Sequence, residues 1–471
     1  MNKTSLAKGT IYLTLSSGLF IVVGYLTNIL LGRLLGPTNY GNYGVIVSLM
    51  SLINIIQTSG LTQSVAKYIA ENEELTDAIM RSAFTLQIIV TGIISIIFFL
   101  LSPTIAALLH DKTLTTYLQL AAFSFPLYGI YALMIDYHNG RHFFKKQALL
   151  NSIYSVTKAL SVISLGLFFQ LKGVIWGFII APLTSLLFGF YYPKQGQVRF
   201  SYKKIILFSL PLIGYILFST LMQSIDLYFV KALLSPESAG FYTSSQNISR
   251  ILYFGTISFS AVLLPSISQS IKQKRHDDTQ KIISLMLRAV ILIILPIAAL
   301  IAATSNQLIS FLYSPIYLPA SSSLMILVVS FSLFTLFTVI CTILIAAGKP
   351  MVAFLLATIG LLLTSLFCSL FIPSLSIQGA ALADMTSNSI VLCLGVGIIY
   401  RFLHIHLPIK TLIKTISISI ILFILARVLV PEMLLLLPLY YLLLICLYFI
   451  MLLLTKELTK QDIMLIKQFK I

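Results

Sequence analysis

Two basic residues lie deep inside long apolar stretches of the sequence, where a charge needs a partner or access to water. The first, Lys158, is about 11 residues, or roughly 16 Å along a helix axis, from either end of the stretch 147–169. A charge at the bilayer centre costs about 2.5–3.5 kcal/mol on insertion scales, so such residues usually face a cavity or a partner. Asn151 and Ser155 precede Lys158 at helical spacing, which gives one polar stripe.

Arg250 is similarly central in the apolar stretch 239–265, and Thr243 and Gln246 fall on the same helical face. A guanidinium suits phosphate because its paired N–H donors match two oxygens at once. The two stripes predict a wet cavity between two lobes, in which the cations attract an anionic group of a substrate. The alternative is structural, since either cation could pair with a carboxylate or with helix-end carbonyls.

Three further residues are candidates for contact with the same substrate. Arg33 lies at a predicted outer turn, although arginines at membrane surfaces also anchor helices. Asn54 and Gln57 could hydrogen-bond a sugar. Hydrogen bonds between neighbouring helices are an equal expectation for such amides.

Acidic residues inside the apolar stretches raise the question of ion coupling. Asp226 shares a helical face with Gln223, and Asp384 lies about a third of the way into its predicted helix. Either carboxylate could bind a coupling proton or sodium ion, and helix capping or ion pairing is the alternative reading. Asp136 lies beside a predicted inner loop and fits a turn.

Composition excludes a water-soluble globule. The 471 residues are 58% hydrophobic and 10% charged, with a mean hydropathy of +0.99, which is typical of an integral membrane protein. The net charge of +17 is scattered between apolar stretches, so membrane topology explains it better than a nucleic-acid partner. The first stretch, Ile11–Leu31, is longer than the apolar part of a signal peptide and predicts a retained helix.

Catalytic and metal-binding motifs are missing from the sequence. It contains no phosphate-binding glycine loop with its lysine, no H-E-x-x-H and no G-x-S-x-G. The four cysteines all lie in apolar stretches at spacings that suit neither zinc nor a disulfide framework. The sequence therefore predicts a protein that is not an enzyme and holds no cofactor or metal.

Apolar stretches long enough to cross a bilayer predict an all-α polytopic membrane protein. We count about fourteen: 10–31, 42–65, 83–101, 115–137, 147–169, 173–192, 205–230, 239–265, 282–303, 321–346, 351–372, 377–400, 410–430 and 434–455. With the N-terminus inside, the inner segments carry 24 Lys and Arg residues and the outer segments carry 5. This bias predicts that both termini are cytoplasmic.

An internal repeat organises the chain. Pro37 and Gly41 reappear as Pro236 and Gly240, and the sequence Gly173-Val174-Ile175 matches Gly379-Ala380-Ala381 about 206 residues later. Each copy has six predicted spans, and an even number makes the copies parallel repeats. We therefore expect an N-terminal lobe at 1–200, a second lobe at 201–400, and two extra helices with a cytoplasmic tail at 401–471. The tail Lys456–Ile471 fits an interfacial helix or a frayed end.

The sequence resembles the polysaccharide export family of oligosaccharide flippases. Nearly the whole chain takes part in this resemblance, and these segments carry it: Gly32-Arg33-Leu34-Leu35-Gly36-Pro37 with Tyr40-Gly41, Val65-Ala66-Lys67-Tyr68-Ile69-Ala70, Leu264-Pro265-Ser266-Ile267-Ser268 and Tyr313-Ser314-Pro315-Ile316-Tyr317. This family belongs to the superfamily that also holds multidrug extruders and lipid II flippases. The second copy is weaker, because Ser235-Pro236-Glu237 stands where the first has Gly36-Pro37-Thr38.

The resemblance implies a two-lobed bundle in the cell membrane. Such a protein moves an undecaprenyl-pyrophosphate-linked oligosaccharide from the inner to the outer leaflet by alternating access, for cell-surface polysaccharide biosynthesis. Its expected partners are the lipid-linked oligosaccharide, membrane lipids, a polysaccharide polymerase and glycosyltransferases. The alternatives are a cation-coupled multidrug extruder and a membrane-embedded glycosyltransferase or polymerase. The sequence leaves open the sugar, the pathway, the coupling ion, the resting conformation and the oligomeric state.

Overall fold

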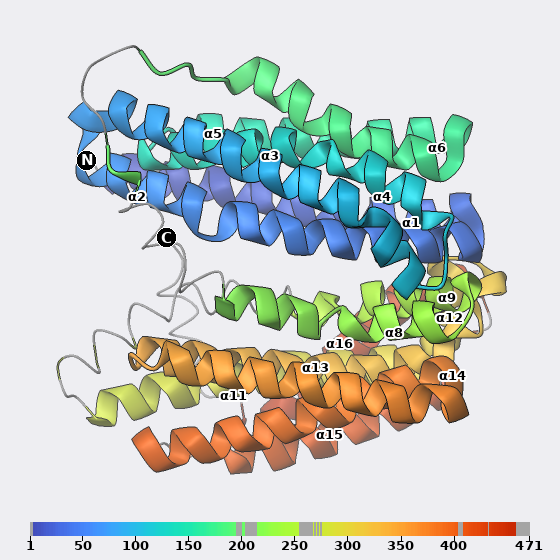
Figure 1. The fold of residues 1–471 in the computed structure, drawn as a ribbon. Coiled ribbons are helices and arrows are strands. Elements are labelled where there is room, and N and C mark those ends of the chain that lie inside the picture. Colours follow the sequence, from blue (N-terminus) through green and yellow to red (C-terminus); the bar gives the residue numbers. More distant parts are fainter. Residues whose placement is uncertain are drawn as a thin grey trace. The chain divides into compact units, whose positions relative to one another are not determined.

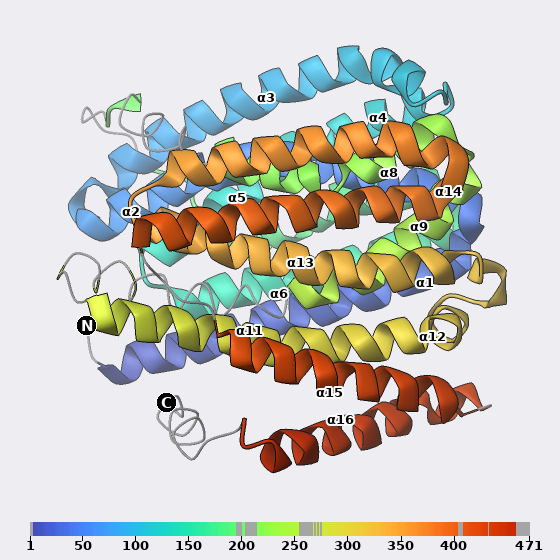
Figure 2. The same ribbon diagram turned by 90° about the horizontal axis from the view of Figure 1, so that it is seen from below.

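The structure, a computed structural model, describes residues 3–194, 200–202, 214–253, 267, 270, 273, 276–403, 408–431 and 433–457. In this part of the chain the regular elements are helices and no strand occurs. The chain divides into two compact units, Met1–Gly240 and Phe241–Ile471. In Figures 1 and 2 the long helices of each unit run side by side. The predicted all-α fold is confirmed.

In its described residues the first unit contains seven complete labelled α-helices. They are α1 (Lys3–Gln57), α2 (Gln63–Glu71), α3 (Thr76–Leu108), α4 (Leu114–Ala122), α5 (Ser124–Gly140), α6 (Phe144–Gly189) and α8 (Ile225–Leu233), together with a π-helix (Thr58–Thr62) and a short 3₁₀ turn at Glu73–Leu75. The unit boundary falls within α9 (Pro236–Ser249). The helices that position the site are α1, α5 and α6, because α6 packs against both of the others.

The second unit is equally helical. Its elements are α11 (His276–Ala303), α12 (Ser305–Leu312), α13 (Ala320–Ala346), α14 (Pro350–Leu403), α15 (Ile409–Val428) and α16 (Leu437–Leu454), with 3₁₀ turns at Pro315–Tyr317 and Leu434–Leu436. Here α13 packs against α14, and α15 packs against α11. The unit boundary at Gly240 differs from the lobe limits that the repeat suggests, and the division into 1–200, 201–400 and 401–471 stays a prediction.

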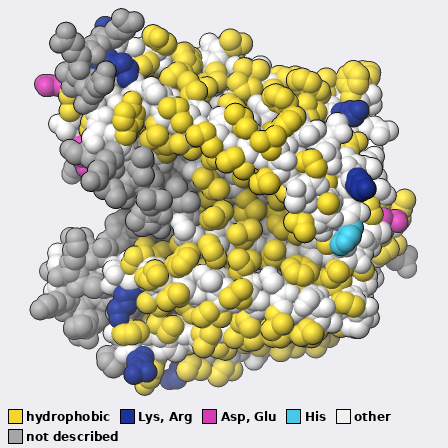
Figure 3. Space-filling model, in the orientation of Figure 1, with side chains coloured by type: hydrophobic (Ala, Val, Ile, Leu, Met, Phe, Trp, Pro, Cys, Tyr) yellow, Lys and Arg dark blue, Asp and Glu magenta, His cyan; other side chains and the backbone are white. Residues whose placement is uncertain are grey.

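The lengths and surfaces of the helices suit a membrane. Nine helices in the described residues are long and apolar enough to cross one, and a tenth is Gly214–Met222 with Ile225–Leu233, bent by 43°. Figure 3 shows hydrophobic side chains over much of the visible surface, with Lys and Arg near the helix ends. A multi-pass membrane protein is therefore what the structure supports.

Three of these helices are each two predicted spans joined at a residue with non-helical backbone. The residues are Gly36 in α1 (φ 69°), Gln170 in α6 (φ 50°, ψ −134°) and Ser376 in α14 (φ 54°, ψ −137°). Positive φ is ordinary for glycine but rare for residues with a side chain. Predicted spans 10–31 and 42–65, 147–169 and 173–192, and 351–372 and 377–400 meet at these breaks.

The repeat predicted from the sequence has a local structural counterpart. Gln170 and Ser376 share the same rare backbone conformation and are 206 residues apart. A Cβ on Gly173 would lie 2.0 Å from the Leu165 carbonyl oxygen, and one on Gly379 would lie 2.3 Å from that of Phe371, again at this spacing. Both glycines let the chain reverse and pack closely against the helix before the break.

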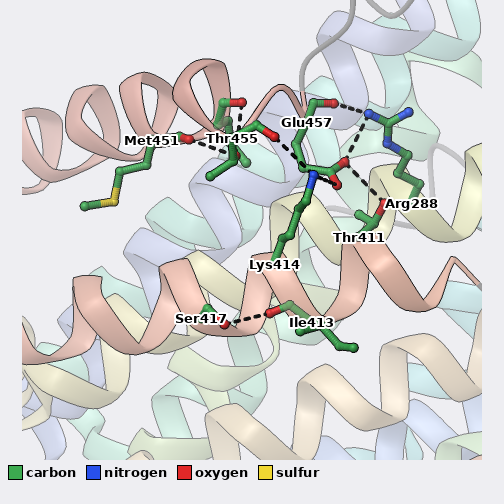
Figure 4. A network of polar contacts seen from close by, with 9 residues as sticks. Arg288, Thr411, Ile413, Lys414, Ser417, Met451, Thr455 and Glu457 are labelled. Atoms are coloured by element: carbon green, nitrogen blue, oxygen red, sulfur yellow. Dashed lines mark hydrogen bonds and ion pairs between the residues drawn. The ribbon is translucent and has the colours of Figure 1, made fainter.

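The last two helices are fixed to the second unit by packing and by ions. The Tyr448 hydroxyl on α16 donates a hydrogen bond to the Leu292 carbonyl oxygen on α11, at 2.6 Å. Figure 4 shows the buried Glu457 carboxylate between Arg288 of α11, at 3.2 Å, and Lys414 of α15, at 3.3 Å. The predicted tail, Lys456–Ile471, lies outside the described residues beyond Glu457, as does most of the Leu264–Ser268 motif.

Candidate functional site

Lys158, the central cation of α6, lies among aromatic rings. Its Nζ atom is 5.2 Å from the ring centroid of Phe178, 5.6 Å from that of Phe20 and 5.9 Å from that of Tyr154. Ring faces are electron-rich, and a cation within about 6 Å of a centroid is attracted to them. We call Phe20, Tyr154 and Phe178 the aromatic cage.

The break at Gln170 brings the cage together. Tyr154 precedes the break and Phe178 follows it, so these rings belong to the two different halves of α6. The halves pack side by side, because the Ser161 hydroxyl donates a hydrogen bond to the Gly177 carbonyl oxygen at 3.2 Å. Phe20 comes from α1, which packs along α6.

Among the described residues, Lys158 has no ion-pair or hydrogen-bond partner for its ammonium group. The predicted alternative, in which an acid neutralises Lys158, therefore does not occur there. Rings lower the cost of the charge without cancelling it. The ammonium group keeps a net positive charge that an anionic ligand can use.

Asn151 is connected to the cage through tyrosines. The Tyr131 hydroxyl donates to the Asn151 Oδ1 atom at 3.3 Å, and the Tyr131 ring stacks on Tyr154 with centroids 4.6 Å apart. Tyr154 also stacks on Phe20 at 6.3 Å. The predicted stripe of Asn151 and Lys158 is thus part of one aromatic and polar cluster in the first unit.

Arg250 and Gln246 lie together at the end of α9 and just beyond it. The Arg250 Nη2 atom donates to the Gln246 Oε1 atom at 3.5 Å, the outer limit of a hydrogen bond. Lys158 belongs to the first unit and Arg250 to the second. That the two cations share one cavity remains a prediction.

Gln57, predicted to contact a sugar, is only 1% exposed. A Cβ built on Gly129 would lie 3.4 Å from the Gln57 Oε1 atom and 2.6 Å from the Gln87 Nε2 atom. The side chains of Gln57 and Gln87 therefore both lie next to Gly129. Neither amide has a hydrogen-bond partner in the described part of the chain, and the Oδ1 atom of Asn54 has none either. These polar groups lie beside the π-helix Thr58–Thr62, a type of irregularity that is frequent at functional sites.

The remaining candidates are one arginine and two carboxylates. Arg33 is exposed on the first half of α1. The Oδ1 atom of Asp226 accepts a hydrogen bond from the Leu227 backbone N–H at 2.8 Å, at the start of α8. In the second unit, the Asp384 carboxylate accepts a hydrogen bond from the Ser330 hydroxyl at 2.7 Å, and Asn388 donates to that hydroxyl at 2.8 Å.

Sequence reasoning missed a buried ion pair in the first unit. Lys231, one of the five basic residues of the predicted outer segments, has its Nζ atom 2.6 Å from Asp111 and 2.7 Å from the Asn42 Oδ1 atom. The His110 Nδ1 atom is 2.9 Å from the Ala232 carbonyl oxygen. Burial, the largest single effect, raises the pKa of Asp111, but the hydrogen bonds from Lys231 and Thr113 and the charge of Lys231 together outweigh it, so that the pKa is lowered.

The repeated turn residues pack against each other beside this ion pair. A Cβ on Gly41 would lie 2.1 Å from the Pro236 carbonyl oxygen, and one on Gly240 would lie 1.9 Å from that of Pro37. The two contacts are reciprocal, and neither tolerates a side chain without a backbone shift. The landmarks that revealed the repeat therefore hold two distant segments of the first unit in contact.

Comparison with known proteins extends these observations. A family model for "Polysaccharide biosynthesis protein" matches residues 30–322. Stage V sporulation protein B of Bacillus subtilis (strain 168) is 21% identical over 450 residues, which cover 87% of this chain and 86% of that protein.

Two solved structures have a similar fold. The inward closed conformation of the lipid II flippase MurJ has a TM-score of 0.78 at 16% identity, covering 95% of this chain and 99% of that chain. An inward-facing multidrug resistance transporter of the MATE family has a TM-score of 0.72 at 14% identity, covering 82% and 94%. At these identities the likeness is one of fold.

Fold and family together define a class and then a family. The protein is a polytopic membrane protein with the fold that the MurJ and MATE-family structures share. The chain belongs to the polysaccharide biosynthesis protein family.

Proposed function

We propose that this protein is a flippase that moves an undecaprenyl-pyrophosphate-linked oligosaccharide from the inner to the outer leaflet of the cell membrane by alternating access. The observation that carries the proposal is Lys158, a cation deep in a predicted span with rings around it and no acidic partner among the described residues. A pyrophosphate group supplies the missing negative charge. Arg250 is proposed as the second cation, whose planar fork matches phosphate oxygens.

The physical task is to move a charged head through a membrane while its tail stays in lipid. Exposing pyrophosphate and sugar hydroxyls to hydrocarbon is very costly, because each polar group loses its hydrogen bonds to water. A cavity lined by Lys158, Arg250, Asn151 and Gln246 would replace those bonds. We include Arg33, Asn54 and Gln57 as further contacts for the sugar or phosphate.

Transport of a fluorescent undecaprenyl-pyrophosphate-linked oligosaccharide in proteoliposomes tests the function. We expect transport that depends on the protein and is inhibited by unlabelled undecaprenyl pyrophosphate, since both lipids carry the same anionic head. Undecaprenol, which lacks the phosphates, should not inhibit. Absence of transport together with active uptake of a cationic dye would contradict the proposal.

A multidrug extruder is the second candidate, because the MATE-family transporter has the same fold. Lys158 argues against it, since a central cation without an acid repels a cationic drug. The dye arm of the same assay separates the two functions.

We further propose that an ion gradient drives transport through Asp384 or Asp226. A coupling ion must bind the two conformations with different affinity to shift their populations. The same vesicles under an imposed proton or sodium gradient test this idea. Undiminished acceleration in both Asp384→Asn and Asp226→Asn proteins would exclude these carboxylates.

Both termini are proposed to face the cytoplasm, and a polymerase and glycosyltransferases are the proposed working partners. In a protein without its four native cysteines, Lys194→Cys should stay unreactive to a membrane-impermeant thiol reagent in intact cells. Thr38→Cys, which is exposed beside the break at Gly36, should react. The opposite labelling pattern would invert the topology.

A further inference from the structure

Two lysines in the first unit are stabilised in opposite ways. Lys231 is 2% exposed and has the carboxylate of Asp111 at 2.6 Å, so the pair carries no net charge. Lys158 has the aromatic cage and no acid among the described residues. The first arrangement suits a structural contact, because both charges are already satisfied.

We propose that the aromatic cage, Phe20, Tyr154 and Phe178, positions Lys158 to bind the phosphate-bearing head of the transported lipid. The inference rests on the proposed function and deepens it, since it assigns a role to residues that never touch the phosphate. A carboxylate in the cage would compete with the ligand for the ammonium group. Rings hold the ammonium group by their electron-rich faces and leave its charge for the ligand.

The cage is itself held in place. Tyr154 is 5% exposed and stacks on Phe20 and Tyr131, with interplanar angles of 15° and 20°. Phe178 reaches Lys158 only because the chain reverses at Gln170 and the two halves of α6 pack together. The position of the ammonium group is thus set by three separate segments, which limits the conformations that its long side chain explores.

Binding of farnesyl pyrophosphate to the purified full-length protein in nanodiscs tests the inference, with farnesol as the uncharged probe. Phe178→Leu keeps an apolar side chain but removes a ring. We expect the affinity for farnesyl pyrophosphate to fall roughly 2- to 30-fold, the range of one cation–π contact, with no change for farnesol. Phe178→Tyr retains the ring and should restore most of the affinity.

Phe188→Leu is the matched control, because Phe188 lies on the same helix, is 64% exposed and makes no cation–π contact with a described residue. If Phe178→Leu lowers protein abundance, Phe20→Leu replaces it, since Phe20 is 39% exposed and its loss leaves little unfilled space. Unchanged affinity for farnesyl pyrophosphate in a folded ring-removing variant would overturn the inference. An equal loss of farnesol binding would overturn it too, because that result indicates a general structural defect.

The inference and the proposed function can fail separately. Transport that stops in Lys158→Ala but continues unchanged in the cage variants would contradict the role of the cage and would be consistent with the flippase proposal. If the cage residues are needed for binding of farnesyl pyrophosphate but the protein transports no lipid-linked oligosaccharide, the role of the cage is supported and the flippase proposal is contradicted.

Discussion

Replacing Arg250 and Lys158 together with alanine should lower transport of lipid-linked oligosaccharide by at least about a hundredfold, with normal abundance in the membrane. Hydrogen bonds to charged groups contribute about 1.5–3 kcal/mol each, and every 1.4 kcal/mol is a factor of ten. The proteoliposome assay measures the rate directly. Arg250→Lys should recover only part of it, because the ammonium group lacks the planar fork that contacts two phosphate oxygens.

Exposed cations in comparable helices provide the control. Lys172 lies on α6 and Arg427 lies in the last turn of α15, and both are exposed. Lys172→Ala with Arg427→Ala removes the same formal charge as the test variant, so a general electrostatic effect would appear in both proteins. Full transport by the Arg250→Ala and Lys158→Ala protein would show that neither cation binds the substrate.

The fold was predictable because its signals are local and strong. Long apolar stretches define helices whatever their neighbours, and proline and glycine mark the break at Gly36. The breaks at Gln170 and Ser376 were found only as gaps between spans. Glutamine and serine rarely adopt positive φ, so the sequence does not predict the conformation that Gln170 and Ser376 share.

Of the candidate site, the sequence predicts only the charged and polar residues that lie inside apolar stretches. Lys158 stands out because a charge in an apolar stretch is rare. The cage residues do not, since aromatic residues make up 12% of the chain and three more of them in apolar stretches are not distinctive. The positions of Gln87 near Gln57 and of Ser330 beside Asp384 depend on which helices pack together. Residue spacing along one helix does not predict such contacts between helices.

The ion pair of Lys231 was missed for a different reason. Counting basic residues on the two sides of the membrane treats each lysine as solvent-exposed. The Lys231 ammonium group instead donates hydrogen bonds to Asn42 and Asp111, which are far from it in sequence. That burial has an energetic consequence that can be measured.

Lys231→Met should lower the free energy of unfolding by about 3–5 kcal/mol, because it leaves a buried carboxylate without its cation. The side chains of Lys231 and Asp111 are 1% and 12% exposed. Adding Asp111→Asn to the variant should recover much of the loss, since the remaining uncompensated charge is removed. Lys67→Met is the matched control: the Lys67–Glu71 pair is 3.9 Å apart and about half exposed, so its loss should cost less than about 1 kcal/mol.

The pH dependence of thermal unfolding separates this pair from ordinary packing. In the parent protein the pKa of Asp111 is below its ordinary value of 3.8, so the carboxylate contributes stability above pH 3.8 that is lost as the pH falls through the lowered pKa. Without Lys231, burial still raises the pKa of Asp111, and only the hydrogen bonds from Thr113 still lower it. The loss of stability on acidification, measured between about pH 3 and pH 6, should therefore be shallower in Lys231→Met than in the parent. Parallel curves for the two proteins would mean that Lys231 contributes through its packing and not through its charge.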